Sequence, residues 1–188
     1  MLSRPSPVET TLAARRLFLR GLGGALAIAA AAPARLLAGP REERLLSFFH
    51  THTGERLTVP YFADGAYLPG GLSTLSSFLR DFRTGDEHPI DPALFDILND
   101  LRLATGTKTP FQVISAYRSP RTNAMLRDNS HGAAQGSLHL RGRAIDVRLA
   151  DVGSASLRDA AIELQRGGVG YYRGPDFVHV DTGRVRRW

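Results

Sequence analysis

Two histidines and one aspartate, separated along the chain, constrain its folding most strongly. His139 and Asp146 lie seven residues apart, and His179 follows after a long interval. Catalytic zinc sites use three such ligands and leave a fourth position open for water. Seven extended residues span roughly 23 Å, which is too far for two ligands of one ion. If the three residues share a metal, the chain must turn back between His139 and Asp146. The segment 141–143, with Gly142 at its centre, is suited to that turn.

The alternation of side chains along the two flanking segments agrees with a shared site. In the expected strand 144–147, Asp146 points to the face opposite to the apolar side chains. In the expected strand 178–182, His179 and Asp181 share the face opposite to two valines. Each strand can therefore offer an apolar face to a core and a ligand face to a cleft. Spacing alone also allows an ordinary His–Asp surface pair, and the same ligand set can hold non-haem iron.

Several segments in the last part of the chain occur together in a familiar order. They are 115–120 (SAYRSP), 137–146 (SLHLRGRAID), 167–172 (GGVGYY), 177–183 (FVHVDTG) and Trp188. This pattern resembles the zinc D-alanyl-D-alanine peptidase superfamily, which includes D,D-carboxypeptidases, D,D-dipeptidases and Hedgehog-type domains. It is most similar to the murein endopeptidase K-like branch found in bacterial envelopes.

The resemblance implies a zinc peptidase site. His139, Asp146 and His179 are expected to hold one zinc ion per chain, which acidifies a bound water so that it can attack a peptide carbonyl. Arg118 follows an expected strand, as does an arginine in relatives that is thought to face the scissile carbonyl. It is expected to stabilise the oxyanion or to clamp a substrate carboxylate, with a surface salt bridge as the alternative.

Two further residues are expected to contact the substrate. Ser137 can donate a hydrogen bond to it, or can simply tighten the loop before His139. Strand alternation lets only one of Tyr171 and Tyr172 face the cleft, and we expect it to be Tyr172.

The general base is less well defined. Many relatives carry a histidine two positions before the last ligand, where this chain has Phe177, which cannot transfer a proton. Other relatives carry a glutamate three positions before that ligand, and Asp176 stands there. Asp181 is the main candidate, because it shares a strand face with His179; either carboxylate can act if its pKa suits the task. Asp181 can instead orient His179, or can be a ligand itself with His179 as the base.

Composition excludes several other mechanisms. The chain has no cysteine, so a thiolate metal site, a disulfide and a cysteine nucleophile are impossible. It also lacks the Gly-x-Ser-x-Gly motif of many serine hydrolases. Of the net charge of +6, half lies in residues 1–34, and no basic run is interleaved with aromatic residues. Nucleic-acid binding is therefore not expected, whereas a mild positive excess suits an anionic cell-wall polymer.

The first 40 residues are typical of an export signal. Residues 14–20 (ARRLFLR) are close to a twin-arginine motif, residues 21–32 are moderately apolar, and residues 32–34 (APA) suit cleavage. The apolar stretch is shorter than the roughly 20 residues that a membrane span requires. We expect residues 1–40 to be a twin-arginine signal peptide with a short linker, recognised by the twin-arginine translocation machinery. The alternatives are an uncleaved membrane anchor and an amphipathic helix on a cytosolic domain.

Residues 41–188 are expected to form one domain of the α+β class. The pattern predicts a hairpin over 45–61, helices over 72–82, 92–105, 120–128 and 157–165, and strands over 111–116 and after Gly168. A small antiparallel sheet with helices packed mainly on one side follows from this order, with the zinc site in a cleft on the sheet.

Together these features predict a zinc-dependent murein endopeptidase of the periplasm or cell envelope, with no stable transmembrane span after processing. By resemblance, it would cleave amide bonds in peptidoglycan cross-links, including those between two diaminopimelate residues. A D-alanyl-D-alanine carboxypeptidase is the alternative enzyme. A non-catalytic, metal-containing wall-binding module is the alternative from another class.

Overall fold

The computed structural model describes residues 42–128 and 134–188. The predicted export signal lies outside the described residues. The elements are the strands β1 Arg44–His50, β2 Arg56–Ala63, β3 Ala66–Tyr67, β4 Phe111–Ser115, β5 Ala144–Arg148, β6 Gly168–Tyr172, β7 Phe177–Asp181 and β8 Arg186–Arg187, and the helices α1 Pro69–Phe78, α2 Pro92–Thr105, α3 Pro120–Asp128, η1 Leu138–Arg141 (a 3₁₀ turn) and α4 Ser154–Leu164. None of the helices in this part of the chain is long and apolar enough to cross a membrane.

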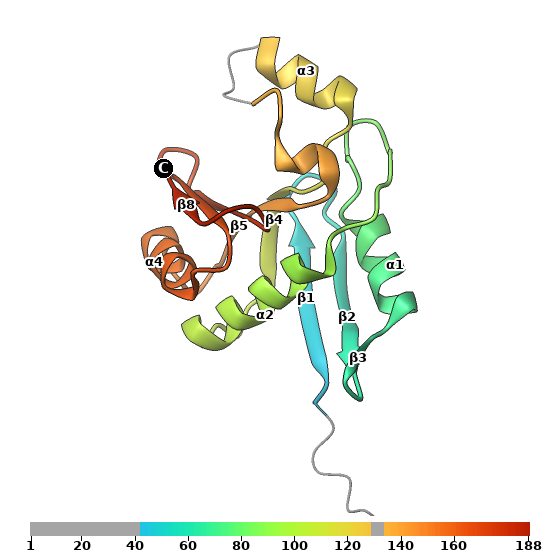
Figure 1. Ribbon diagram of the computed structural model, residues 1–188, viewed down its shortest axis with the longest axis vertical. Coiled ribbons are helices and arrows are strands. Elements are labelled where there is room, and N and C mark those ends of the chain that lie inside the picture. Colours follow the sequence, from blue (N-terminus) through green and yellow to red (C-terminus); the bar gives the residue numbers. More distant parts are fainter. Residues whose placement is uncertain (1–41, 129–133) are drawn as a thin grey trace, which may run out of the picture. The chain divides into compact units, whose positions relative to one another are not determined.

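The described strands form one mixed sheet. Their order is β3-β2-β1-β4-β5-β7-β6-β8, and Figure 1 shows how the helices lie around it. Most neighbours are antiparallel, while β1 with β4 and β6 with β8 are parallel. The predicted α+β class is confirmed, although the sheet is larger than the pattern of the sequence suggested.

The core lies between one face of the sheet and the helices. Phe48 of β1 packs against Phe78 of α1 and Phe111 of β4. Tyr61 of β2 packs against Phe95 of α2 in the same way, and α4 covers β6 and β7. All these residues belong to one buried apolar cluster. This arrangement leaves the opposite face of β5 and β7 available for polar side chains.

Local chemistry sets the helix boundaries. The predicted helix over 92–105 is confirmed: Asp91 accepts a hydrogen bond from the Ala93 amide at 3.1 Å, Pro92 begins the helix, and Gly106 ends it in the left-handed region. The helix predicted over 72–82 begins earlier, at Pro69, and ends at Phe78. The chain then turns so that the buried Asp81 accepts the Ser119 amide, which fixes the start of the segment that carries α3.

Candidate metal centre

Three buried side chains converge on the sheet face that the helices leave free. Asp146 on β5 and His179 on β7 are direct partners in the antiparallel register, and His139 comes from η1. One ligand atom from each residue lies within 4.8 Å of the others. Asp146 Oδ1 is 2.8 Å from His179 Nδ1 and 3.3 Å from His139 Nε2, and the two nitrogens are 3.2 Å apart. The structure thus brings together the three residues predicted as ligands.

The outer nitrogens of the two histidines fix which nitrogen faces the cluster. His139 Nδ1 lies 2.6 Å from the carbonyl oxygen of Ala116, which can only accept, so this nitrogen carries the proton. His179 Nε2 lies 3.1 Å from the Asp181 carboxylate and donates to it. With neutral imidazoles, three acceptors therefore face one another. Such a set is unfavourable by itself and fits a shared cation, as orienting partners do for metal-bound histidines.

The electrostatics of the cluster favour deprotonated ligands at two of the three positions. Burial lowers the pKa of His139. Burial opposes ionisation of Asp146, but the neighbouring His139 and His179 outweigh it and hold its pKa below the usual range. Burial also opposes protonation of His179, yet hydrogen bonds to Asp146 and Asp181 outweigh it, so its pKa is raised. A proton and a cation therefore compete for His179.

The loop that carries His139 turns tightly and packs closely against the neighbouring backbone. Ser137 caps η1, where its hydroxyl accepts the His139 amide at 3.4 Å. Gly142 ends the turn with φ +61°, and a Cβ there would lie 2.3 Å from the Pro89 carbonyl oxygen. The predicted turn between His139 and Asp146 is confirmed at Gly142. Ser137 has a capping role besides any contact with substrate.

Arg118 contacts the cluster through Oδ2 of Asp146, the oxygen that does not face the histidines. Its Nη2 lies 2.5 Å from Asp146 Oδ2, and its Nε donates to the Ser115 hydroxyl at 2.9 Å. The Arg118 amide donates to the carbonyl oxygen of His139 at 3.2 Å. Both the side chain and the backbone of Arg118 are thus fixed against ligand residues. Among the described residues, Nη1 of Arg118 has no hydrogen-bond partner, so this nitrogen can donate to a substrate oxygen.

The two candidate bases are placed very differently. Asp181 is fully buried, and it accepts from His179, from the amides of Gly168 and Gly183, and twice from Arg186. Burial opposes its ionisation, but these donors outweigh burial and lower its pKa. This geometry suits an acceptor that orients His179 rather than a group that exchanges protons.

Asp176 lies in the turn between β6 and β7. It has a positive φ of 56°, and its carboxylate accepts the Ser154 hydroxyl at 2.5 Å. The structure does not bring it to the metal cluster. Among the described residues lining the cleft, Asp146 is the only carboxylate.

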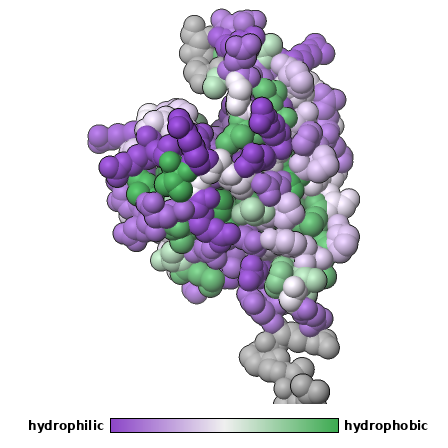
Figure 2. All heavy atoms as spheres, in the orientation of Figure 1, coloured by the Kyte–Doolittle hydropathy of each residue, from purple (hydrophilic) through white to green (hydrophobic). Residues whose placement is uncertain are grey.

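A cleft of about 330 Å³ opens onto the ligand atoms. Its wall includes Arg118, Ser137, Tyr172, Phe177, Arg186 and Trp188. In the space-filling view, the surface is hollowed between α3 and β8 (Figure 2). Tyr172 stacks on Phe177 with ring centroids 4.5 Å apart, whereas Tyr171 packs against the core. Tyr172 is thus the tyrosine of this pair that faces the cleft.

Comparison with known proteins identifies the family. The family model of the peptidoglycan L,D-endopeptidase MepK matches residues 39–188. The peptidoglycan L,D-endopeptidase MepK of Escherichia coli strain K12 is 40% identical over 178 residues, covering 93% of this chain and 97% of the relative. The chain belongs to the MepK family of peptidases.

A second relative supports the same assignment. The probable peptidoglycan L,D-endopeptidase MepK of Haemophilus influenzae is 41% identical over 146 residues, covering 77% of this chain and 78% of the relative. The resemblance inferred from the sequence motifs is therefore confirmed.

Some contributors to the site had no clear signal in the sequence. The carbonyl oxygen of Ala116 fixes the His139 tautomer, but a backbone group carries no residue preference. Asp81 anchors the segment of Arg118 from a distant loop. Arg186 stands in no motif of the sequence, yet the structure places it in the cleft wall together with Trp188.

Proposed function

We propose that this chain is a zinc-dependent endopeptidase that hydrolyses amide bonds in peptidoglycan cross-links, including those between diaminopimelate residues. The observation that carries the proposal is the convergence of three ligand atoms, His139 Nε2, His179 Nδ1 and Asp146 Oδ1. Two histidines and one carboxylate with an open side toward a cleft suit a catalytic zinc ion. Membership of the MepK family supports peptidoglycan as the substrate.

Each residue of the site has a separate role in the proposed reaction. His139, Asp146 and His179 would hold a zinc ion, which would supply an acidified water and polarise the scissile carbonyl. Arg118, held by Asp146 and Ser115, would direct Nη1 to the carbonyl oxygen, where a fixed guanidinium stabilises developing negative charge. Asp181 holds His179 with Nδ1 directed to the cluster. Tyr172 and Phe177 form an apolar wall against which the peptide can lie.

The proposal is tested by digestion of purified peptidoglycan sacculi with the chain lacking residues 1–40. We expect cross-linked muropeptide dimers to be converted to monomers, as read by mass spectrometry. A chelator and the His139→Ala variant should each abolish the conversion. Release of D-alanine alone would replace the endopeptidase by a carboxypeptidase. Binding to sacculi without any cleavage would leave a wall-binding module.

We further propose that the enzyme acts in the periplasm or cell envelope after export by the twin-arginine machinery. The support is the sequence of residues 14–34, with its arginine pair, apolar stretch and small residues. Peptidoglycan lies outside the cytoplasmic membrane, so an enzyme acting on it must be exported.

A further inference from the structure

Arg186 of the edge strand β8 is fixed in the cleft wall by backbone pairing and by contact with an aromatic ring. The strand β8 adds in parallel to β6, where the Trp188 amide donates to the Val169 carbonyl oxygen and the Trp188 carbonyl accepts the Tyr171 amide. The Arg186 guanidinium lies over the Trp188 ring at 4.8 Å. The Trp188 indole in turn donates to the Tyr172 hydroxyl at 3.1 Å.

Glycine residues clear the space in which Arg186 lies. A Cβ on Gly168 would come within 2.2 Å of Arg186 Nη1 and 2.5 Å of Asp181 Oδ2. A Cβ on Gly170 would come within 2.6 Å of the Trp188 ring. Any side chain at Gly168 or Gly170 would therefore clash with the side chains of Arg186 and Trp188. This preorganisation lowers the entropic cost of using Arg186 to bind a ligand.

The ion pair with Asp181 uses only the Nη1–Nη2 edge of the Arg186 guanidinium. Nη1 and Nη2 donate to the two oxygens of Asp181 at 3.0 and 2.7 Å, and Nη1 also donates to the Arg184 carbonyl oxygen at 3.2 Å. Within the described residues, Nε donates to no acceptor. A guanidinium has five N–H donors, and Nε–H with the remaining Nη2–H forms a second fork along the other edge. That fork matches a carboxylate.

The charge of the cleft also favours an anionic ligand. Arg118 and Arg186 both line it, while Asp146 is the only carboxylate among the described lining residues. Asp181 is fully buried, whereas the Arg186 side chain is 33% exposed. The buried carboxylate therefore anchors the arginine without covering it.

We propose that Arg186 binds a free carboxylate on the substrate residue next to the scissile amide, through the fork that Asp181 leaves unused. The inference rests on the proposed function and names what the same site recognises. Peptide cross-links in which the residue beside the amide has lost its carboxylate charge, as in an amidated diaminopimelate, are then poor substrates.

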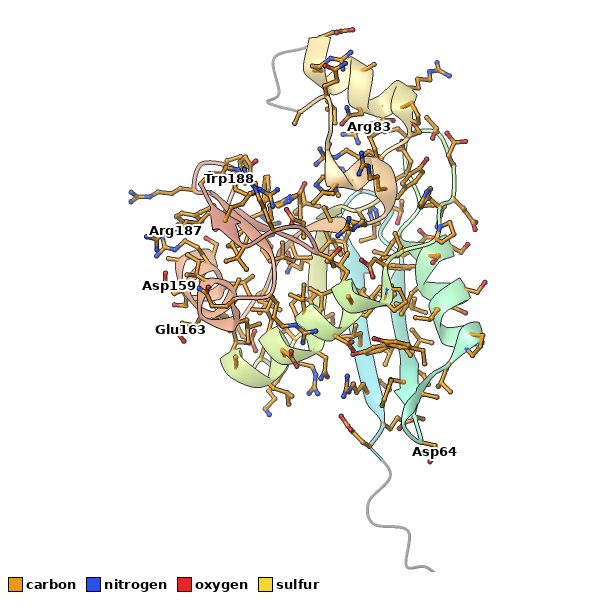
Figure 3. All side chains as sticks on the ribbon, viewed as in Figure 1. Asp64, Arg83, Asp159, Glu163, Arg187 and Trp188 are labelled. Carbon is orange, nitrogen blue, oxygen red and sulfur yellow. The ribbon has the colours of Figure 1, made fainter. Side chains whose placement is uncertain are left out.

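The test compares two cross-linked muropeptides that differ only in a carboxylate or a carboxamide beside the scissile bond. We expect the wild-type enzyme to favour the carboxylate by about 10- to 100-fold in kcat/KM, as a charge-assisted bidentate pair implies. Arg186→Gln should bring that ratio close to one, because the fork is lost. Arg187→Gln removes the same charge from the neighbouring residue, which Figure 3 labels beside Trp188, and should keep the full preference.

Each other outcome has a distinct meaning. Equal cleavage of the two substrates by the wild-type enzyme would overturn the inference without any variant, and would leave the endopeptidase proposal intact. An Arg186→Gln enzyme that keeps the preference while slowing on both substrates would assign Arg186 a structural role only. Failure of the wild-type enzyme to cleave either substrate would instead overturn the proposed function.

Discussion

Asp181 shows how one residue can serve the site without touching the substrate. It gathers five donors, from His179, Gly168, Gly183 and twice from Arg186, and it is fully buried. A carboxylate engaged in this way can fix the tautomer of His179 but has no spare oxygen directed into the cleft. The structure therefore favours the orienting role over the role of general base.

The Asp181→Asn variant separates these two roles. The asparagine side chain would place an N–H group against the N–H donors that now bind Asp181. We therefore expect His179 to lose its orientation and zinc affinity to fall by about 10- to 100-fold. Competition with a chromogenic chelator measures that affinity. If Asp181 were the base, the variant would bind zinc like the wild type and would lose only turnover.

His50 gives the fold a dependence on pH that is separate from the metal. The residue is 1% exposed, and its ring packs against Phe78 and Phe82. Burial lowers its pKa from 6.5 to about 4. Between these two values the unfolded chain binds the proton more readily than the folded one. The free energy of unfolding should therefore decrease as the pH falls from about 6.5 to 4, by up to roughly 3 kcal/mol.

Urea denaturation of the metal-free protein at pH 7 and pH 4.5 measures this contribution. The His50→Leu variant serves as the reference, because it removes the titrating group while keeping an apolar side chain among the same rings. The wild type should lose more stability than the variant on acidification. An equal loss in both proteins would show that His50 does not contribute to the acid sensitivity.

Among the elements of the fold, the short strand β8 supplies one side of the cleft wall. It carries Arg186 and leads to Trp188, whose ring lies 5.2 Å from that of His179. The space for this ring depends on Gly170, the register partner of His179 on β6. A methyl group on Gly170 should push the ring out of the cleft wall while the rest of the sheet stays paired.

The Gly170→Ala variant tests this dependence with a built-in probe, because Trp188 is the only tryptophan in the chain. We expect its fluorescence emission to shift to longer wavelength and muropeptide cleavage to fall, with little change in the far-ultraviolet circular dichroism. An unchanged emission spectrum together with full activity would show that the ring is not held as described.

Elements with a long periodic pattern could be predicted from the sequence. The helix over 92–105, the hairpin of β1 and β2, and the strands β4, β6 and β7 followed from apolar spacing, proline and glycine. The two-residue strands β3 and β8 and the single turn η1 could not, because they are too short to show a period. Their positions depend on contacts with distant strands.

Only part of the candidate site could be predicted from the sequence. Its three ligand residues stand in motifs that are local in the sequence. Asp181, the support of His179, is also local, but other supports come from far away: Asp81 lies 38 residues before the Ser119 amide that it accepts, and His139 bonds to a carbonyl 23 residues earlier. Such long-range hydrogen bonds leave no spacing rule in the chain, so the sequence identifies the ligands better than it identifies what holds them.

At the level of the whole molecule, the proposed export signal can be tested separately from the peptidase domain. The proposed signal depends on Arg15 and Arg16. Replacing both with lysine should leave the precursor in the cytoplasm, whereas the native signal should deliver the domain to the periplasm. Cell fractionation with immunoblotting measures the distribution, and export of the double variant at the native level would contradict this pathway.

We propose that His139, Asp146 and His179 hold one zinc ion that is required for cleavage. Elemental analysis of the purified domain, paired with muropeptide digestion of the same samples, tests it most directly. We expect about one zinc per wild-type chain and loss of both zinc and cleavage in Asp146→Ala. Added zinc should restore cleavage by the chelated wild type. An Asp146→Ala protein that retains zinc and cleaves cross-links would contradict the assignment of the site.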